Sequence, residues 1–301
     1  MLAPLGLGVA RTDLDRAVAS RYNPPMLLLL AALALAAPDL TAVKVVANIP
    51  YLTGASYPND WDKLDLYLPE GKRGVPVIVW IHGGALTQDD KNLEVATGRR
   101  FAEAGIATAT VNYRLSPAVS HPAHVQDAAA SFAWVKRHIE EYGGDPDNVF
   151  LVGHSAGAYL AQLLVTDERY LKTYGLSARD VRAVVPISAF FWVEKDGVAP
   201  DRPKSVWGTD PQTWIDASPA HHLRANLPRT LIIYADGDEP WRRQQNLDMA
   251  RAMKSAGSPP VDVVEIAGRS HMSIWRKLGE AGDPASERVI AFVTSATVRA
   301  K

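Results

Sequence analysis

The stretch that decides the fold reads Val149-Phe-Leu-Val-Gly-His-Ser-Ala-Gly-Ala158. Its apolar run ends at Gly153 in a turn with Ser155 at the apex, and a small, leucine-rich segment follows as far as Val165. This order predicts a buried strand, a sharp turn and a helix, the G-x-S-x-G pattern of a nucleophile elbow. The two glycines relieve crowding in so tight a turn and leave the serine hydroxyl facing outward. Because such short patterns also arise by chance, the prediction depends on partner residues elsewhere in the chain.

Apolar strands alternate with helical patterns on both sides of this stretch. The segments predicted as strands are 43–49, 64–68, 75–81, 106–111, 149–152, 183–187, 230–235 and 261–267. Helical patterns cover 89–104, 122–142, the segment after Ser155, 241–256 and 285–298. This alternation predicts an α/β fold with a mostly parallel eight-stranded sheet and helices on both faces. Segment 64–68 alternates apolar and polar residues cleanly, which predicts a half-exposed strand near the sheet edge.

Residues 189–225 interrupt the alternation. They are irregular, rich in proline, and carry Phe190, Phe191, Trp192 and Trp207. A segment of this length is too long for a simple connection, so we expect a small lid insertion. Its aromatic side chains either line a substrate pocket or pack the insertion onto the core.

A serine hydroxyl becomes a nucleophile when a base takes its proton and a third group holds that base in place. In an elbow fold the acid and then the histidine follow the serine along the chain. His271 comes directly after the last predicted strand, where this architecture places the base. The other downstream histidines, His221 and His222, lie in the insertion and are typical of surface residues at a helix start.

The acid is expected after the preceding strand, where the chain reads Asp236-Gly-Asp-Glu239. Asp238 is favoured because it lies one residue past the glycine and clear of the strand end. Asp236 and, less well, Glu239 remain alternatives, and a turn with several carboxylates can also be merely solvated. The predicted triad is therefore Ser155, His271 and Asp238.

A tetrahedral intermediate also needs hydrogen-bond donors for its oxyanion. The backbone N–H of Ala156, at a helix N-terminus, is one candidate. Gly83 and Gly84 directly follow a predicted buried strand, and without side chains they let a substrate oxygen approach closely. His82 is expected to anchor this glycine loop.

Taken together, His82-Gly-Gly, Gly153-His-Ser-Ala-Gly157, Asp238 and His271 resemble the α/β-hydrolase superfamily in its His-Gly-Gly esterase and lipase branch. Further similar stretches are Leu64-Asp-Leu-Tyr-Leu-Pro69, Asn112-Tyr-Arg-Leu-Ser116 and Tyr142-Gly-Gly-Asp-Pro-Asp-Asn148, so the resemblance covers about 43–298. It implies a serine hydrolase that acts on small-molecule carboxylic esters through an acyl-enzyme, with no cofactor and no metal.

Two subgroups of this branch fit the chain. One contains carboxylesterases, including feruloyl-esterase-like enzymes. The other contains arylformamidases, which Gly237-Asp-Glu-Pro-Trp-Arg-Arg-Gln244 and His271-Met-Ser-Ile-Trp275 resemble. Arylformamidases usually carry an aromatic pair after the glycines, where this chain has Ala85-Leu86, and this difference favours the esterases. A non-catalytic binding protein on the same scaffold is a third possibility, but the chain retains every residue of the predicted triad and glycine loop.

Composition limits the possible partners. The chain is 47% hydrophobic and 22% charged, with a net charge of -1 and no cysteine, which is typical of a soluble globular protein. The near-neutral charge gives no reason to expect nucleic acid or an acidic membrane as a partner. The lack of cysteine excludes disulfides and thiolate chemistry.

The N-terminal segment, residues 1–38, is unlike the rest and precedes the predicted domain, 39–301. Its apolar run 26–37 is too short for a membrane span, which needs about 20 residues. Followed by Pro38 and containing Ala34-Leu-Ala36, it fits a secretory signal, so a secreted or periplasmic protein is expected. The alternatives are a translation start at Met26, or a helix packed on the domain of a cytoplasmic protein.

Overall fold

One sheet organises the part of the chain that the computed structural model describes, residues 42–54, 57–195 and 197–298. Its strands lie in the order β1-β2-β4-β3-β5-β6-β7-β8. The strands are β1 (Val43–Pro50), β2 (Lys63–Pro69), β3 (Val75–Ile81), β4 (Ala107–Val111), β5 (Gly144–His154), β6 (Ala183–Ile187), β7 (Arg229–Gly237) and β8 (Val261–Ser270). Only the β1–β2 and β2–β4 pairs among these are antiparallel. The predicted mostly parallel eight-stranded sheet is therefore confirmed.

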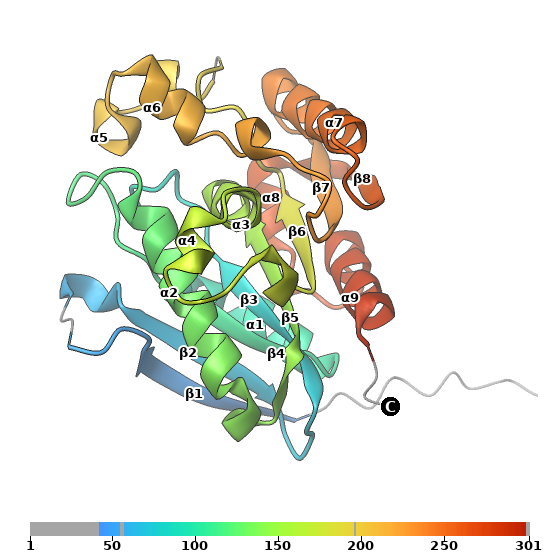
Figure 1. The fold of residues 1–301 in the computed structure, drawn as a ribbon. Helices are drawn as coiled ribbons and strands as arrows, with labels where there is room; N and C mark the ends of the chain where they lie inside the picture. Colours follow the sequence, from blue (N-terminus) through green and yellow to red (C-terminus); the bar gives the residue numbers. More distant parts are fainter. Residues whose placement is uncertain (1–41, 55–56, 196, 299–301) are drawn as a thin grey trace, which may run out of the picture. The chain divides into compact units, whose positions relative to one another are not determined.

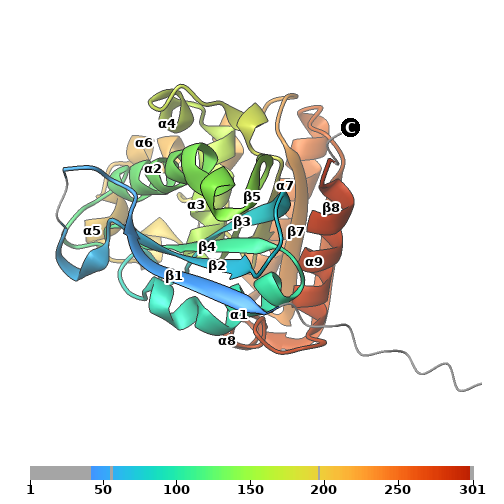
Figure 2. The same ribbon diagram turned by 90° about the horizontal axis from the view of Figure 1, so that it is seen from below.

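Helices cover both faces of the sheet (Figure 1, Figure 2). They are α1 (Val95–Glu103), α2 (Ala123–His138), α3 (Ala156–Thr166), α4 (Arg169–Lys172), α5 (Lys204–Trp207), α6 (Pro211–Asp216), α7 (Pro240–Ser255), α8 (His271–Arg276) and α9 (Pro284–Ala296). Short 3₁₀ turns are η1 (Pro58–Asp60), η2 (Lys91–Glu94), η3 (Ile139–Tyr142), η4 (Ala178–Asp180), η5 (Ala199–Asp201) and η6 (Pro219–His222). None of the helices in the described ranges is long and apolar enough to cross a membrane. The predicted signal segment lies outside those ranges.

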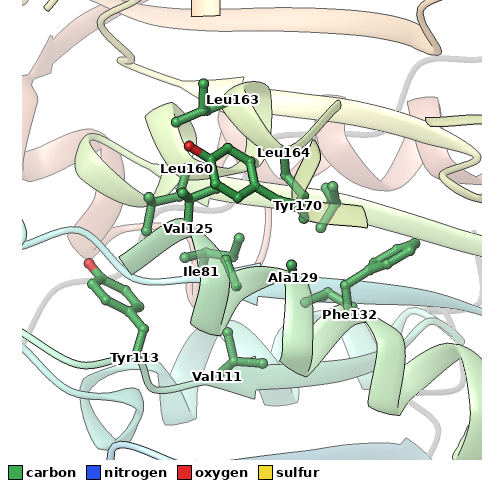
Figure 3. Packing of buried hydrophobic residues seen from close by; sticks show 14 of the residues in the cluster. Ile81, Val111, Tyr113, Val125, Ala129, Phe132, Leu160, Leu163, Leu164 and Tyr170 are labelled. Atoms are coloured by element: carbon green, nitrogen blue, oxygen red, sulfur yellow. The ribbon is translucent and has the colours of Figure 1, made fainter. Parts of the chain in front are cut away.

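The core has two layers because successive side chains of a strand point to opposite faces. Odd-numbered residues of β3 pack with α2 and α3 on one face, where Figure 3 shows Ile81 beside Val125 and Leu160. Even-numbered residues of the same strand, such as Trp80, pack with α1, α8 and α9 on the other face. Burying each large apolar side chain contributes roughly 1.5–3 kcal/mol. Strands covered on both faces hold the residues at their carboxyl ends in fixed positions.

The segment 64–68 lies near the sheet edge as predicted, but the prediction that it is half-exposed is wrong. β2 lies between β1 and β4, and its residues from Leu64 to Pro69 are buried. The apparent polar alternation comes from Asp65, which forms a buried ion pair with Lys91 at 2.9 Å. Tyr67, the next residue on that face, packs its ring directly against Gly98 of α1. A paired buried carboxylate and a buried tyrosine thus imitate the pattern of a solvent-exposed face.

The expected insertion lies between β6 and β7 and consists of η5, α5, α6, η6 and their connections. Its aromatic residues pack inward. The ring of Phe190 stacks on that of Tyr159 at 4.6 Å, and Trp207 meets both rings edge-on. Phe190, Phe191 and Trp207 are buried. Of the two interpretations open from the sequence, packing onto the core is the one the structure favours.

Candidate active site

Ser155 lies in the turn between β5 and α3 with φ 55° and ψ -116°. Non-glycine residues rarely adopt this conformation, and such strain persists only where the surroundings impose it. Here the Ser155 N–H donates to the Ile187 carbonyl at 2.9 Å, which ties the turn to the neighbouring strand β6. A Cβ at Gly157 would collide with the Ile81 carbonyl oxygen, and one at Gly153 would lie 2.6 Å from the Gly157 carbonyl carbon. The tight turn therefore requires both glycines of the motif.

The three residues of the predicted triad form a continuous hydrogen-bond chain. The Ser155 hydroxyl lies 2.9 Å from Nε2 of His271, and Nδ1 of His271 lies 2.7 Å from Oδ1 of Asp238. A carboxylate can only accept, so the proton on the imidazole is assigned to Nδ1. Nε2 is then free to accept the serine proton. The residues come from the ends of β5, β7 and β8, which lie along one edge of the sheet.

Asp238 is held by donors on its other oxygen. Oδ2 accepts hydrogen bonds from the Ser188 hydroxyl at 2.6 Å and from the Ala235 N–H at 2.9 Å. Burial raises the pKa of this carboxyl, but the hydrogen bonds from His271, Ser188 and Ala235 outweigh it, so its pKa lies below the usual value. Asp238 is therefore ionised at neutral pH and oriented toward the imidazole.

The competing candidates lie elsewhere. Asp236 accepts hydrogen bonds from the N–H groups of Gly268 and Arg269, which joins the ends of β7 and β8. Glu239 contacts Arg242 at 3.1 Å. His221 pairs with Glu194 in the insertion, and His222 bonds the Asp216 carbonyl. None of them contacts Ser155.

The glycine loop presents free backbone donors beside the serine. Gly83 approaches the elbow so closely that an added Cβ would lie 3.2 Å from the His154 carbonyl oxygen. Gly84 has φ +85°, and a Cβ there would collide with the Gln88 carbonyl. No described residue accepts a hydrogen bond from the N–H of Gly83 or Gly84. The N–H of Ala156, the first residue of α3, has no acceptor within its helix.

His82 and Tyr113 stabilise the glycine loop. Their rings stack at 4.3 Å, and the Tyr113 hydroxyl lies 3.0 Å from the His82 carbonyl and 2.8 Å from that of Gly83. Burial lowers the pKa of His82 to about 4, so its ring is neutral at physiological pH. Tyr113 lies within the Asn112–Ser116 stretch of the sequence, but nothing in that stretch indicated its contact with the glycines.

A second buried layer supports His271. Nε2 of His154 lies 2.9 Å from the His271 carbonyl, so it carries a proton and donates. Burial, reinforced by the adjacent His271, keeps the pKa of His154 well below its usual range, and the ring stays neutral. The ring of Trp275 lies parallel to that of His154. Nε1 of Trp275 donates a hydrogen bond to Oε1 of Glu94 at 2.9 Å. Sequence reasoning did not identify His154, Trp275 or Glu94 as part of the site.

Glu94 is expected to make stability fall with pH. Burial raises the pKa of its carboxyl from 4.5 to about 7, against the hydrogen bond from Trp275 that lowers it. Between these two pH values the folded protein keeps a proton that the unfolded chain has released, so its free energy of unfolding decreases as pH rises. Glu94→Gln should remove this dependence. Between pH 4.5 and pH 8, the free energy of unfolding of the variant should increase relative to that of wild type by up to about 3 kcal/mol. Unfolding by denaturant at pH 4.5 and pH 8 measures this difference. If the unfolding free energies of the two proteins changed in parallel with pH, the prediction would be contradicted.

A cavity of about 210 Å³ opens on Ser155 and His271. Its other lining residues are Gly83, Gly84, Ala85, Gln88, Asp89, His154, Arg202, Arg242, Met272 and Trp275. A larger cavity of about 870 Å³, beside α2, α4 and α6, contains none of the predicted site residues. The smaller cavity contains both the predicted nucleophile and the predicted base, so it is the candidate active site. The charged residues of this site that sequence reasoning did not single out are Asp89, Arg202 and Arg242.

One group of potential metal ligands occurs among the described residues, formed by Asp238, Glu239 and His271 within 4.8 Å of one another. Nδ1 of His271 and Oδ1 of Asp238 already share a hydrogen bond. A metal ion bound by these two atoms would have to replace that bond and its proton. The donor set is therefore better suited to orienting the imidazole than to holding a cation.

Known proteins share sequence and fold with this chain. The family model described as BD-FAE matches residues 64–253. The probable carboxylic ester hydrolase LipM of Mycobacterium tuberculosis is 29% identical over 234 residues, which are 72% of this chain and 53% of LipM. The chain thus spans about half the length of that relative.

Two solved structures share the fold. The carboxylesterase EstE1, from a metagenomic library, is 25% identical, with a TM-score of 0.70 over 87% of this chain and 92% of its own. A truncated carbohydrate esterase from gut microbiota is 21% identical, with a TM-score of 0.72 over 86% of this chain and 98% of its own. The α/β-hydrolase fold predicted from the sequence motifs is confirmed.

Proposed function

Because this chain belongs to the BD-FAE family, we propose that it is a serine carboxylic ester hydrolase that works through an acyl-enzyme. The observation that carries the proposal is the unbroken hydrogen-bond chain from Ser155 through His271 to Asp238. The backbone N–H groups of Gly83, Gly84 and Ala156 lie beside it, and we assign to them the role of oxyanion donors. The esterase names of the relatives support the same reaction class.

In the proposed mechanism, Nε2 of His271 takes the hydroxyl proton as the Ser155 oxygen attacks the ester carbonyl. Asp238 stabilises the imidazolium that forms. Negative charge develops on the carbonyl oxygen, where the N–H groups of Gly83, Gly84 and Ala156 stabilise it. His271 then donates its proton to the leaving alcohol, and the acyl group remains on the serine oxygen. A water activated by the same histidine hydrolyses the acyl-enzyme.

The size of the cavity sets an expectation for the substrate. Its volume of about 210 Å³ is below the range of roughly 300–1,000 Å³ that is usual for sites holding drug-sized ligands. Short-chain esters are therefore the substrates that fit best. The aromatic residues of the insertion do not enlarge this space, because they pack against α3.

The proposal predicts covalent labelling at one residue. A p-nitrophenyl alkylphosphonate should add a single phosphonyl group, and peptide mass spectrometry should locate it on Ser155, because the hydroxyl of that residue lies 2.9 Å from Nε2 of His271. Hydrolysis of p-nitrophenyl acetate and butyrate should exceed that of the octanoate, and N-formylkynurenine, which tests amide hydrolysis, should be the poorer substrate. Equal labelling of wild type and Ser155→Ala would contradict the proposal.

A further inference from the structure

Two arginines from separate elements line the cavity that contains Ser155 and His271. Arg202 comes from the insertion between β6 and β7, and Arg242 from the first turn of α7. Asp89 is the single carboxylate among the described lining residues, and burial raises the pKa of its carboxyl. Two guanidinium groups and one carboxyl group therefore line the cavity in which an ester must bind.

The guanidinium of Arg242 is already engaged by the protein. Its Nη1 donates to the Ser188 carbonyl at 3.0 Å, and its Nε lies 3.1 Å from Oε2 of Glu239. The same Nε lies 3.8 Å from Oδ1 of Asp238. The side chain is buried, and its role is to hold the turn that carries Asp238.

The guanidinium of Arg202 has no such partner. Within the described residues no carboxylate forms an ion pair with it, and its hydrogen bond runs from Nε to the Gly197 carbonyl at 3.5 Å. Its Cζ lies 5.4 Å from the centre of the Phe190 ring, over which the guanidinium group packs. Burial, with the charge of Arg242 adding to it, lowers the pKa of Arg202 to about 10, so it remains cationic at neutral pH.

Arg202 is thus a half-buried cation in the cavity of the nucleophile, and no carboxylate of the described residues forms an ion pair with it, so its guanidinium can pair with an anionic group of a bound ligand. We propose that Arg202 selects ester substrates carrying a carboxylate, on either the acyl or the alcohol portion. The planar guanidinium can bind both oxygens of a carboxylate, which fixes the orientation of the ester relative to Ser155. This inference rests on the proposed ester hydrolysis at Ser155 and names the class of substrate.

Two matched ester pairs test the inference and distinguish the two positions of the charge. For the alcohol side they are 4-acetoxybenzoate and neutral 4-acetoxybenzamide; for the acyl side, monomethyl succinate and methyl succinamate. The measured quantity is the ratio of kcat/KM for the anionic ester to that for the neutral ester. In at least one pair, Arg202→Gln should lower this ratio roughly 10- to 100-fold relative to wild type, and Arg202→Lys should lower it less.

The control variant is Arg251→Gln, because Arg251 lies on the exposed side of α7 and pairs with Asp248 outside the cavity. It removes the same charge and should leave both ratios unchanged. Circular dichroism and thermal unfolding verify that the insertion of each variant remains folded. If Arg202 only packs against Phe190, stability changes in Arg202→Gln but neither ratio does, and the inference is overturned while ester hydrolysis stands.

A binding measurement separates the inference from the proposed activity. Calorimetric titration of 4-acetoxybenzoate and monomethyl succinate into Ser155→Ala should give at least one dissociation constant that rises when Arg202→Gln is added. Equal affinities of the single and double variants for both anions would overturn the inference, even if wild type hydrolysed no ester. Failure of wild type to cleave any of the four esters, with this loss of affinity intact, would count against the proposed reaction alone.

Discussion

Replacing Ser155 with alanine is expected to lower kcat for p-nitrophenyl butyrate by a factor on the order of 10⁶. The substitution removes one oxygen, the hydroxyl that lies 2.9 Å from Nε2 of His271. The backbone bond from residue 155 to Ile187 and the turn it holds do not depend on the side chain. A residual rate of about 10³–10⁴ over water is expected from the oxyanion donors alone.

Steady-state kinetics measures this loss, and near-ultraviolet circular dichroism verifies the fold. Ser295→Ala is the matched control, because Ser295 lies on the exposed side of α9 and bonds the Phe292 carbonyl. It should keep the wild-type kcat. If kcat of Ser155→Ala stayed within about tenfold of wild type, the nucleophile would have to be another group.

Much of this site follows from the sequence because its geometry depends on local rules. Gly153 and Gly157 are required by steric exclusion in the turn, which leaves a pattern that can be read along the chain. The order of Ser155, Asp238 and His271 follows from the order of strands in the sheet, so each could be assigned to a strand end. Asp238 could be favoured over Asp236 because only one of them lies past the strand end.

The rest depends on contacts between distant segments. Asp65 looked solvent-exposed because its partner Lys91 is far away in the sequence. Arg202 enters the cavity only through the path of the insertion, which has no periodicity to read. The sequence did not indicate whether the aromatic side chains of that segment face the substrate pocket or the core. The partner of Phe190, Tyr159, belongs to a different element, α3. Composition and spacing carry no information about such pairs.

Asp238→Asn is expected to lower kcat about 10⁴-fold, although the two side chains have the same shape. The reason lies in the donors on Oδ2. The Ala235 N–H and the Ser188 hydroxyl both point at this atom, at 2.9 and 2.6 Å. An asparagine must place its carbonyl oxygen there, because an NH₂ group facing the Ala235 N–H would leave that buried donor unsatisfied.

The amide NH₂ of the introduced asparagine would then occupy the place of Oδ1 of Asp238, 2.7 Å from Nδ1 of His271 in the present structure. An NH₂ group donates, so the imidazole would be forced to accept at Nδ1 and to carry its proton on Nε2. In that tautomer Nε2 has no lone pair for the Ser155 proton, and the substrate can bind without reacting. KM should therefore change much less than kcat.

Two further measurements separate this tautomer effect from loss of structure. Nitrogen-15 chemical shifts of His271 should move from the Nδ1-protonated to the Nε2-protonated form. The depressed pKa of Asp238 stabilises the fold above the unfolded value of about 3.9, and this contribution is lost as pH falls through the folded pKa. The stability advantage of wild type over Asp238→Asn should therefore shrink on acidification.

Asp236→Asn, in the same turn but without contact to His271, should keep the wild-type kcat and tautomer. A kcat of Asp238→Asn within about tenfold of wild type would mean that the carboxylate does not set the protonation of His271.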